Sequence, residues 1–337
     1  MFKIALVGCG GMAQNYRAIY TQIPGAELAA VVDANEEVAR GCAQELGVDR
    51  WGTDFSLALA PDIEMVDVST PNNLHRDQTI TAFEAGKHVL VQKPMAPTAA
   101  EAEAMIRAGR EAKRELGIYM WFFDNPMYYE LKKMLQAGLF GKISQIRTRG
   151  AHRGGLNLPP GTWRGSGKKT GGGSFIQLAI HPLNMALWLL DDSVARVGAF
   201  SKNLYCPNVG GDDVTTAICE LKSGILGVLD SSYAADPNLL EIYGTRGYVR
   251  ITKERVVELQ LDQSYQGEHL QCQANVAANL DCPRPQSSPT EQHKAFVQAM
   301  LSGGPAPIPG EVGLRDLRIV EAVYRSAETG KIENVEE

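Results

Sequence analysis

The sequence predicts an α/β protein with a doubly wound parallel sheet in its first domain and an α+β second domain with a mostly antiparallel sheet. Three observations predict this. Short apolar runs alternate with helix-like segments over the first third of the chain, and a glycine-rich turn follows the first run. After about residue 125, strand-like segments follow one another with few helices between them. Because 337 residues exceed one typical core, we expect two domains, 1–124 and 125–337, with the closing helices able to pack back on the first.

Composition and charge narrow the class of protein. Hydrophobic residues make up 44% and charged residues 21%, as in ordinary soluble globular proteins. A net charge of −6 argues against a nucleic-acid partner. We find no run of about 18 apolar residues, so no membrane partner is expected. The N-terminus lacks the features of a signal peptide, and the six cysteines form no C-x-x-C pair, which together favour a reducing cytoplasmic location. No His/Cys/Asp cluster has metal-ligand spacing, so we predict no metal.

The first domain is expected to alternate strands and helices. Its strands read as near-continuous apolar runs, which is typical of parallel strands buried on both faces. Thr98, with Glu101 three residues later, predicts the start of the last helix. The expected strands are 2–8, 26–33, 63–70, 87–94 and 118–123, and the expected helices are 13–22, 35–47, 74–86 and 98–117.

The second domain is expected to be rich in strands. Turn signals such as "KSG" and "GTRG" separate several of them and predict hairpins. The expected strands lie within 142–151, 194–204, 215–234, 239–251 and 256–262, and the expected helices are 126–138, 175–191, 289–303 and 313–330. The polar, Gln/Pro/Ser-rich segment 262–288 is expected to be a long loop.

The stretch "GCGGMA" matches the pattern G-x-G-x-x-G/A between a strand and a helix-like segment. Gly8 would permit the tight turn, Gly10 would let the backbone approach a pyrophosphate, and Ala13 would keep the helix close to the sheet. The helix N-terminus would offer free N–H groups to the phosphates. The alternative is a purely structural turn. The candidate cofactor-binding residues of this turn are Gly8, Gly10, Gly11, Met12 and Ala13.

Asp33 ends the second predicted strand, about two dozen residues after the glycine turn. An acidic residue at this place can accept hydrogen bonds from ribose hydroxyls of an adenine dinucleotide. Ala34 and Asn35 follow it, and no neighbouring arginine is positioned to pair with a 2′-phosphate. The pattern therefore favours NAD over NADP, with Asp33 and Ala34 as cofactor-binding residues.

Two further strand ends carry candidate residues. "STPNNLH" closes the third strand, where Thr70, Pro71 and Asn72 would contact the cofactor, and His75 is either a helix-capping residue or a group of the pocket. "VLVQKPMAP" closes the fourth strand with a lysine at position 93, which is either structural or chemical.

Five motifs occur together in one order: "GCGGMA", "VVDAN", "STPNNLH", "VQKPMAPT" and "GGGSFIQLAIHPLNMALWLL". In this the chain resembles the Gfo/Idh/MocA oxidoreductases, the relatives of glucose–fructose oxidoreductase and inositol 2-dehydrogenase, over nearly its whole length. The resemblance implies an N-terminal Rossmann domain and a C-terminal domain with a large open sheet that commonly forms an oligomer interface, hence a homodimer or homotetramer. It also implies NAD(P)-dependent oxidation or reduction of a secondary alcohol on a sugar, sugar acid or cyclitol.

The resemblance also implies roles for individual residues. Lys93 would lie beside the nicotinamide ribose and the substrate hydroxyl, between Gln92 and Pro94, with a cis peptide before the proline. A cation there can stabilise a developing alkoxide. His181 matches the general base of the family, and Gln177, four residues earlier, shares its helix face.

The chain departs from the family pattern at three positions. Gln92, Gln177 and Asn184 stand where the family often has an acid. An amide can orient a hydroxyl but cannot balance a charge. We therefore expect a less negative pocket, and one hypothesis is that the substrate itself carries an anionic group.

Further candidates for substrate binding lie in or near the Gly/Pro-rich loop that precedes the catalytic helix. His152, Trp163 and Arg164 would border the substrate, since an aromatic face suits a sugar ring and arginine can bind hydroxyls or a carboxylate. Tyr233 is a weaker candidate. Two alternative functions share the fold: an NAD-dependent glycosidase that oxidises the ring transiently, and a non-catalytic NAD-binding regulator.

Overall fold

The computed structural model describes residues 1–120, 125–252, 256–281 and 290–336. The chain divides into two compact units. The first comprises Met1–Asp124 together with Gln286–Leu314, which we call the closing segment. The second comprises Asn125–Pro285 and Arg315–Glu337.

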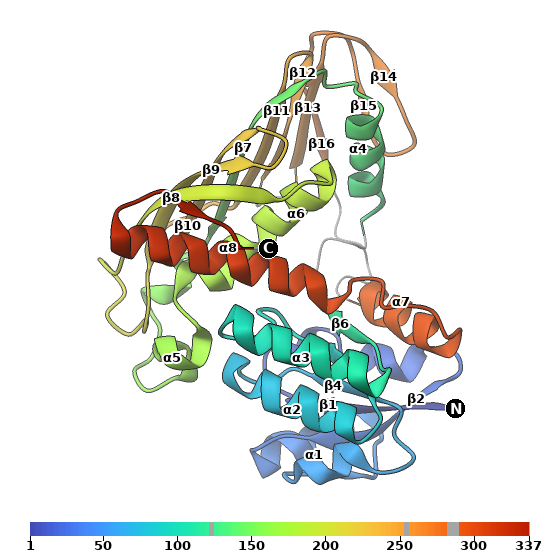
Figure 1. Ribbon diagram of the computed structural model, residues 1–337. Helices are drawn as coiled ribbons and strands as arrows, with labels where there is room; N and C mark the ends of the chain where they lie inside the picture. Colours follow the sequence, from blue (N-terminus) through green and yellow to red (C-terminus); the bar gives the residue numbers. More distant parts are fainter. Residues whose placement is uncertain (121–124, 253–255, 282–289, 337) are drawn as a thin grey trace. The chain divides into compact units, whose positions relative to one another are not determined.

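The first unit contains a six-stranded parallel sheet in the order β3-β2-β1-β4-β5-β6, which confirms the doubly wound fold (Figure 1). Its strands are β1 (Phe2–Val7), β2 (Ala26–Val32), β3 (Trp51–Gly52), β4 (Met65–Val68), β5 (His88–Val91) and β6 (Leu116–Ile118). The chain winds outward from β1 to β3 and then starts again at β4 on the other side of β1. The reversal between β1 and β4 is the point at which such sheets bind ligands.

Helices cover this sheet. They are η1 (Ala13–Asn15), η2 (Arg17–Gln22), α1 (Glu36–Leu46), η3 (Phe55–Leu59), α2 (Asn72–Glu84), α3 (Ala99–Ala112) and α7 (Thr290–Leu301). α2 and α3 pack side by side (Figure 1). Side-chain oxygens cap two helices: Asn35 accepts from two N–H groups at the start of α1, and Thr98, as its capping pattern predicts, accepts from the N–H of Glu101 at 3.3 Å.

Three expectations for this unit are corrected. The helix expected over 13–22 is two short 3₁₀ segments, broken at Tyr16, whose φ of −140° is not helical. The helix expected over 98–117 ends at Ala112, because Lys113 adopts the left-handed conformation. The following strand therefore begins at Leu116, and the rest of the strand expected over 118–123 lies partly outside the described residues.

The closing segment completes the first unit. Phe296 lies in the main hydrophobic core, and the N–H of Ile118 in β6 donates to the carbonyl of Ile308 at 3.0 Å. The side chain of Gln292 bonds the same edge twice, accepting from the N–H of Met120 and donating to the carbonyl of Ile118, both at 2.7 Å. The closing segment thus covers the outer edge of β6.

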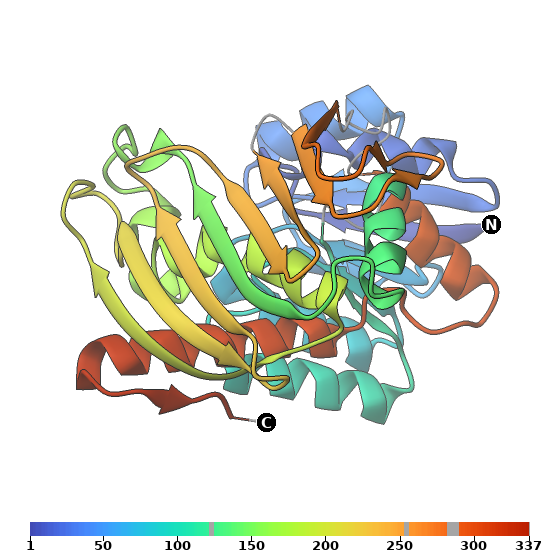
Figure 2. The same ribbon diagram turned by 90° about the horizontal axis from the view of Figure 1, so that it is seen from above.

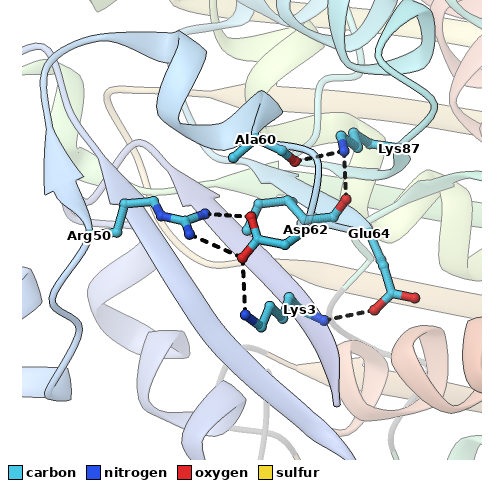
Figure 3. A network of polar contacts seen from close by, with 7 residues as sticks. Lys3, Arg50, Ala60, Asp62, Glu64 and Lys87 are labelled. Atoms are coloured by element: carbon cyan, nitrogen blue, oxygen red, sulfur yellow. Dashed lines mark hydrogen bonds and ion pairs between the residues drawn. The ribbon is translucent and has the colours of Figure 1, made fainter.

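A polar network fixes the amino-terminal edge of the same sheet (Figure 3). Arg50 donates to both oxygens of Asp62 at 2.9 and 3.0 Å, and the ammonium group of Lys3 reaches the same carboxylate at 3.0 Å. The buried Lys87 donates to two carbonyl oxygens of the loop 60–64 at 2.8 and 2.7 Å. These contacts lie where β1, β4 and β5 begin. The charged side chains at this edge therefore stabilise the sheet.

The second unit is built on a nine-stranded sheet in the order β16-β13-β12-β11-β7-β10-β9-β8-β17. Figure 2 looks onto it, with green β7 near the middle. Among the described pairs only β7 and β10 run parallel, so the mostly antiparallel sheet is confirmed. Its strands are β7 (Ile143–Ala151), β8 (Val194–Lys202), β9 (Val214–Leu221), β10 (Leu226–Ser232), β11 (Leu239–Gly244), β12 (Gly247–Thr252), β13 (Val256–Leu261), β16 (Ala278–Asp281) and β17 (Glu333–Asn334).

The remaining elements of this unit are mainly helical. They are α4 (Pro126–Gln136), η4 (Arg153–Gly155), η5 (Trp163–Gly165), α5 (Gly167–Thr170), the π-helical η6 (Phe175–Ala179) and α6 (Ile180–Leu190), with α8 (Gly310–Thr329) ending in this unit. The helical stretch Gly167–Leu190 is long and apolar enough to cross a membrane, but 72% of its most apolar window is buried. It packs against β7 as a core helix does.

The segment 262–288, expected to be one long loop, contains short strands in its described part. β14 (Tyr265–Gln266) pairs with β15 (Gln271–Cys272), and β16 pairs with β13 at the edge of the large sheet. Sequence reasoning missed them because each is short and polar. Residues 282–289 lie outside the described part.

Candidate active site

The candidate cofactor residues of the first unit gather at one edge of its sheet. Gly8 follows β1, Asp33 follows β2, Thr70 follows β4 and Lys93 follows β5. Because all these strands are parallel, their carboxyl ends meet at the same edge, which is where ligands bind in open α/β sheets. The network around Asp62 occupies the opposite edge.

The glycine turn has one closely packed position and two open ones. Gly8 has a φ of +90°, and a Cβ there would lie 2.7 Å from the carbonyl group of Ser69, so glycine is required. A Cβ at Gly10 or Gly11 would meet no described atom within 4 Å. The backbone at these two positions is therefore uncovered by protein and available to a ligand. Next to them Met12 is exposed and Ala13 is buried.

Asp33 supports the turn and retains capacity to bind a ligand. One carboxylate oxygen accepts from the N–H of Cys9 at 2.8 Å, and the other accepts from the N–H of Asn35 at 2.9 Å. A carboxylate offers about four acceptor positions, so ribose hydroxyls can still bind. Glu36 and Glu37 follow in the first turn of α1 and would repel an additional phosphate. These residues fit NAD better than NADP.

His75 is fully buried between two of the strand-end loops. Its Nε2 lies 2.7 Å from the carbonyl oxygen of Thr70, and its Nδ1 lies 3.1 Å from that of Pro94. Burial lowers the pKa of this imidazole. The side chain neither caps α2, which begins after Pro71, nor reaches the surface. Its position is that of a support which ties the end of β4 to the end of β5.

The remaining residues of these loops differ in exposure. Lys93 is half-buried, and the Lys93–Pro94 peptide is cis, as the resemblance implies. Gln92 is buried on the inner side of the strand end, beside the hydroxyl of Tyr16. Thr70 and Pro71 are half-buried, whereas Asn72 is buried. The residues of this group that a ligand can reach are therefore Lys93, Thr70 and Pro71.

A buried acid lies directly behind this edge. Asp67 in β4 accepts from the hydroxyl of Tyr20 at 2.7 Å and of Tyr16 at 3.3 Å, and the Nε2 of His293 lies 3.9 Å away. Burial raises the pKa of Asp67 to about 7. Tyr16 also contacts the hydroxyl of Ser69, next to the glycine turn. Sequence reasoning missed this cluster, although one acid inside the apolar run "MVDV" was a signal for it.

In the second unit, the triple glycine before η6 and α6 is held by a buried carboxylate. Asp212 accepts from the N–H groups of Gly173 at 3.0 Å and Phe175 at 2.9 Å, and from the hydroxyls of Ser174 and Tyr324, both at 2.7 Å. A Cβ at position 173 would overlap the backbone of Asp212, so this position admits only glycine. Asp212 and Tyr324 were missed because they are distant in sequence from the glycines.

The three polar residues of the helical segment have different surroundings. Gln177 lies in the π-helical turn η6 with its side chain buried, 3.5 Å from the carbonyl of Thr170. Asn184 is fully buried in α6. His181 lies between them in sequence and is only partly buried. Of the three residues, His181 is therefore the most accessible to a ligand. The π-helical turn beside it is also of a kind that is frequent at functional sites.

The loop candidates form two contacting pairs. The rings of His152 and Tyr233 lie 5.1 Å apart, and the guanidinium of Arg164 lies 4.4 Å from the ring of Trp163. Burial raises the pKa of Tyr233 well above its usual value, and the positive charge of Arg164 acts against this. Asp213, next to Asp212, accepts from backbone N–H groups of residues 204–206 and is structural.

The fold and the glycine-turn edge define a dinucleotide-dependent oxidoreductase with NAD as its cofactor. Residues 2–120 match the oxidoreductase family with an NAD-binding Rossmann fold, GFO_IDH_MocA, and residues 128–250 match the GFO/IDH/MocA C-terminal domain. The chain belongs to the Gfo/Idh/MocA family of oxidoreductases, as the motifs of the sequence imply. Among the described residues no group of three or more His, Cys, Asp or Glu side chains could hold a metal ion.

Individual relatives support this assignment. The chain is 30% identical over 263 residues to the scyllo-inositol 2-dehydrogenase (NAD(+)) of Bacillus subtilis, covering 74% of this chain and 73% of that protein. It is 28% identical over 340 residues to the D-apiose dehydrogenase of Paraburkholderia graminis, covering 98% and 88%. The crystal structure of the aldose-aldose oxidoreductase from Caulobacter crescentus complexed with glycerol matches with a TM-score of 0.85 at 26% identity, covering 99% of both chains.

Proposed function

We propose that the substrate is a sugar, sugar acid or cyclitol, and that the enzyme interconverts one of its secondary alcohols with a ketone. Relatives named for inositol and apiose support a polyhydroxylated substrate. The loop of the second unit supports it too, because the Trp163 ring offers an apolar face, and Arg164 and His152 offer polar groups.

The residues of the first unit would hold NAD by the glycine turn, Asp33 and the loops that end β4 and β5. NAD, when bound, supplies the acceptor or donor of the hydride. Lys93 would place its ammonium group against the reacting oxygen and stabilise negative charge that develops there. His181 would take the hydroxyl proton during oxidation and return it during reduction, a task for which an imidazole pKa near neutrality is suited. Gln177 would orient a substrate hydroxyl.

The observation that carries these roles is the contrast in exposure along the catalytic helix. Gln177 and Asn184, before and after His181, are buried, whereas His181 is half-buried.

The direct test is a panel of sugars, sugar acids, cyclitols and aryl glycosides, incubated with the protein and NAD. Net formation of NADH supports the dehydrogenase. Release of aglycone without net NADH would indicate the glycosidase, and cofactor binding without turnover would indicate the regulator. Lys93→Met and His181→Ala should each lower kcat by about 100-fold or more. Lys3→Met at the opposite edge of the sheet is the matched control and should leave kcat unchanged.

We further propose that the protein forms a homodimer or homotetramer through the open face of the large sheet. Ile218 and Leu226, 61% and 54% exposed, line a groove of about 360 Å³ on this face, and Phe200, 81% exposed, lies further along β8. Exposed apolar side chains gathered on one face can mark a protein–protein interface. Light scattering after size-exclusion chromatography tests the proposal: Phe200→Glu should yield monomers, and an unchanged oligomer would place the interface elsewhere.

The proposed location is the cytoplasm, with no nucleic-acid or membrane partner. The net charge is −6, and the five cysteines of the described residues are all free and buried. Free thiols are the normal state in a reducing compartment. Cell fractionation with an antibody against the chain tests this placement.

A further inference from the structure

Two cysteines that are distant in sequence meet in the core of the first unit. Cys9 is the second residue of the glycine turn, and Cys42 lies in α1. Both are free and fully buried in the same hydrophobic cluster, and their thiols are joined by a side-chain hydrogen bond. The sequence does not indicate this pair, because the two cysteines have no C-x-x-C spacing and belong to different elements.

A buried arginine lies against the pair. The guanidinium of Arg17 in η2 donates to the carbonyl oxygen of Cys9 at 3.3 Å and also pairs with the carboxylate of Glu45. The hydrogen bond from Cys9 lowers the pKa of Cys42; burial opposes this effect, and the positive charge of Arg17 supports it. The same hydrogen bond raises the pKa of Cys9. Two thiols of unequal acidity in contact, with a cation beside the more acidic one, have the chemistry of a redox pair.

Cys9 lies next to the part of the turn that protein does not cover. Gly10, Gly11 and Met12 follow it and are exposed. A small oxidant such as hydrogen peroxide therefore needs only a local opening of the turn to reach the thiols. Cys42, by contrast, belongs to a helix that is capped at its start and packs against β2 and β3. An S–S bond of about 2.0 Å is far shorter than a contact between two thiols, so a sulfur must move when the bond forms, and the turn has the room to do so.

A movement of Cys9 would disturb the edge of the sheet that carries the cofactor residues. The N–H of Cys9 donates to Oδ2 of Asp33 at 2.8 Å, and its neighbour Gly8 is closely packed. A shift of the turn therefore weakens the support of the carboxylate proposed to bind the ribose. It also displaces the backbone N–H of Gly10, which follows Cys9 directly, from the position in which it can meet a pyrophosphate.

We propose that Cys9 and Cys42 are a modification site, where a peroxide forms a disulfide that weakens the binding of NAD. The Cys42 thiolate attacks one oxygen of hydrogen peroxide; the O–O bond breaks, a sulfenic acid forms, and the hydroxide released takes up the proton that Cys42 had lost. The Cys9 thiol then attacks this sulfur, so that the S–S bond forms, the S–O bond breaks, and water leaves with the thiol proton. Two thiols and one peroxide thus give one disulfide and two molecules of water. A dithiol reverses the change by exchange, as is usual for a disulfide in a reducing compartment.

The test compares the reduced and the peroxide-treated protein. Mass spectrometry after alkylation under denaturing conditions should find the peptides of Cys9 and Cys42 joined by a disulfide. The Kd for NAD, measured by calorimetry, should rise by about 10-fold or more, since a hydrogen bond to a charged phosphate is lost. Dithiothreitol should restore the original Kd, and NAD added before the peroxide should slow the reaction because it covers the turn.

Three variants serve as controls. Cys42→Ala keeps Cys9 without its partner, so it should bind NAD as the wild type does, before and after peroxide. Cys219→Ala removes a buried thiol of the second unit and should keep the full response of the wild type. Gly10→Val tests the placement of NAD, on which the inference rests. A Cβ there meets no described atom within 4 Å, so the added side chain should block the pyrophosphate and raise the Kd without a loss of folding.

These results separate the two proposals. If Gly10→Val binds NAD with the Kd of the wild type, NAD does not lie at the turn, and the proposed function of this edge fails. If Gly10→Val is impaired but peroxide produces no Cys9–Cys42 link, or produces the link with no change in Kd, only the redox proposal is refuted. A loss of affinity that Cys42→Ala shares with the wild type also refutes it, because the oxidised group then lies elsewhere.

Discussion

The buried Asp67 makes the stability of the first unit depend on pH, and Asp67→Asn should remove that dependence. Burial raises the pKa of this carboxyl from about 3.8 to about 7, so the native state holds a proton that the unfolded chain releases. Stability contributed by the protonated form is therefore lost as the pH rises between these two values. The difference corresponds to roughly 4 kcal/mol, an upper limit because a protonated His293 at 3.9 Å would stabilise the charged carboxylate.

The asparagine variant keeps the local geometry. Its amide oxygen can accept from Tyr20 and its NH₂ group can donate to Tyr16, so the cluster remains hydrogen-bonded without a charge. The free energy of unfolding of the variant, relative to wild type, should therefore rise by about 2–3 kcal/mol between about pH 5 and about pH 8.

Hydrogen exchange of the β1 and β4 amides, corrected for intrinsic rates at each pH, measures this difference within the first unit alone. Asp49→Asn, at an exposed carboxylate, serves as the control and should show a constant difference. If Asp67→Asn and wild type change in parallel over the whole range, Asp67 does not titrate there, and the argument from burial is refuted.

Three further outcomes are expected. His75→Ala removes the support between two cofactor loops and should raise the KM for NAD by about 10-fold, which steady-state kinetics measures; an unchanged KM would show that the loops hold themselves. Gly173→Ala forces a methyl group against the backbone of Asp212 and should cost about 2–4 kcal/mol in denaturant unfolding, whereas no loss would mean that the loop can move aside. Arg164→Ala, at the exposed partner of Trp163, should raise the substrate KM without changing the melting temperature, and an unaltered KM would remove it from the site.

The sequence predicts the parts of the fold that depend on local pattern. Apolar runs that alternate with helices fix the parallel sheet, and hairpin signals indicate the antiparallel one. The prediction of one helix over 13–22 is wrong because the conformation of this segment depends on contacts with residues far along the chain. Tyr16 and Tyr20 both turn toward Asp67, some 47–51 residues later, and the two 3₁₀ segments bring both hydroxyls to the same carboxylate.

The residues of the candidate site also fall into those that local sequence patterns predict and those that depend on distant contacts. Gly8, Asp33 and Lys93 are recognisable because each follows a strand within a short motif. The residues that hold the motifs in place are not, because their partners are remote: Asp316, which accepts a hydrogen bond from Asn184, is 132 residues from it, and Tyr324 is 112 residues from Asp212. Nothing in the spacing of a sequence indicates which distant acid will lie behind a given amide.

The closing segment has a consequence for the order in which the protein is made. The first unit begins with the first residue synthesised, yet its core and the cover of β6 await residues 286–314. At roughly 5–20 residues per second, the ribosome needs about 10–40 s to pass from β6 to the end of that segment. Throughout this interval the edge strand β6 and the part of the core that Phe296 will fill are exposed, and other nascent chains can bind there. The first unit thus waits much longer for its last residues than the second unit, whose two segments are separated by only 29 residues of chain.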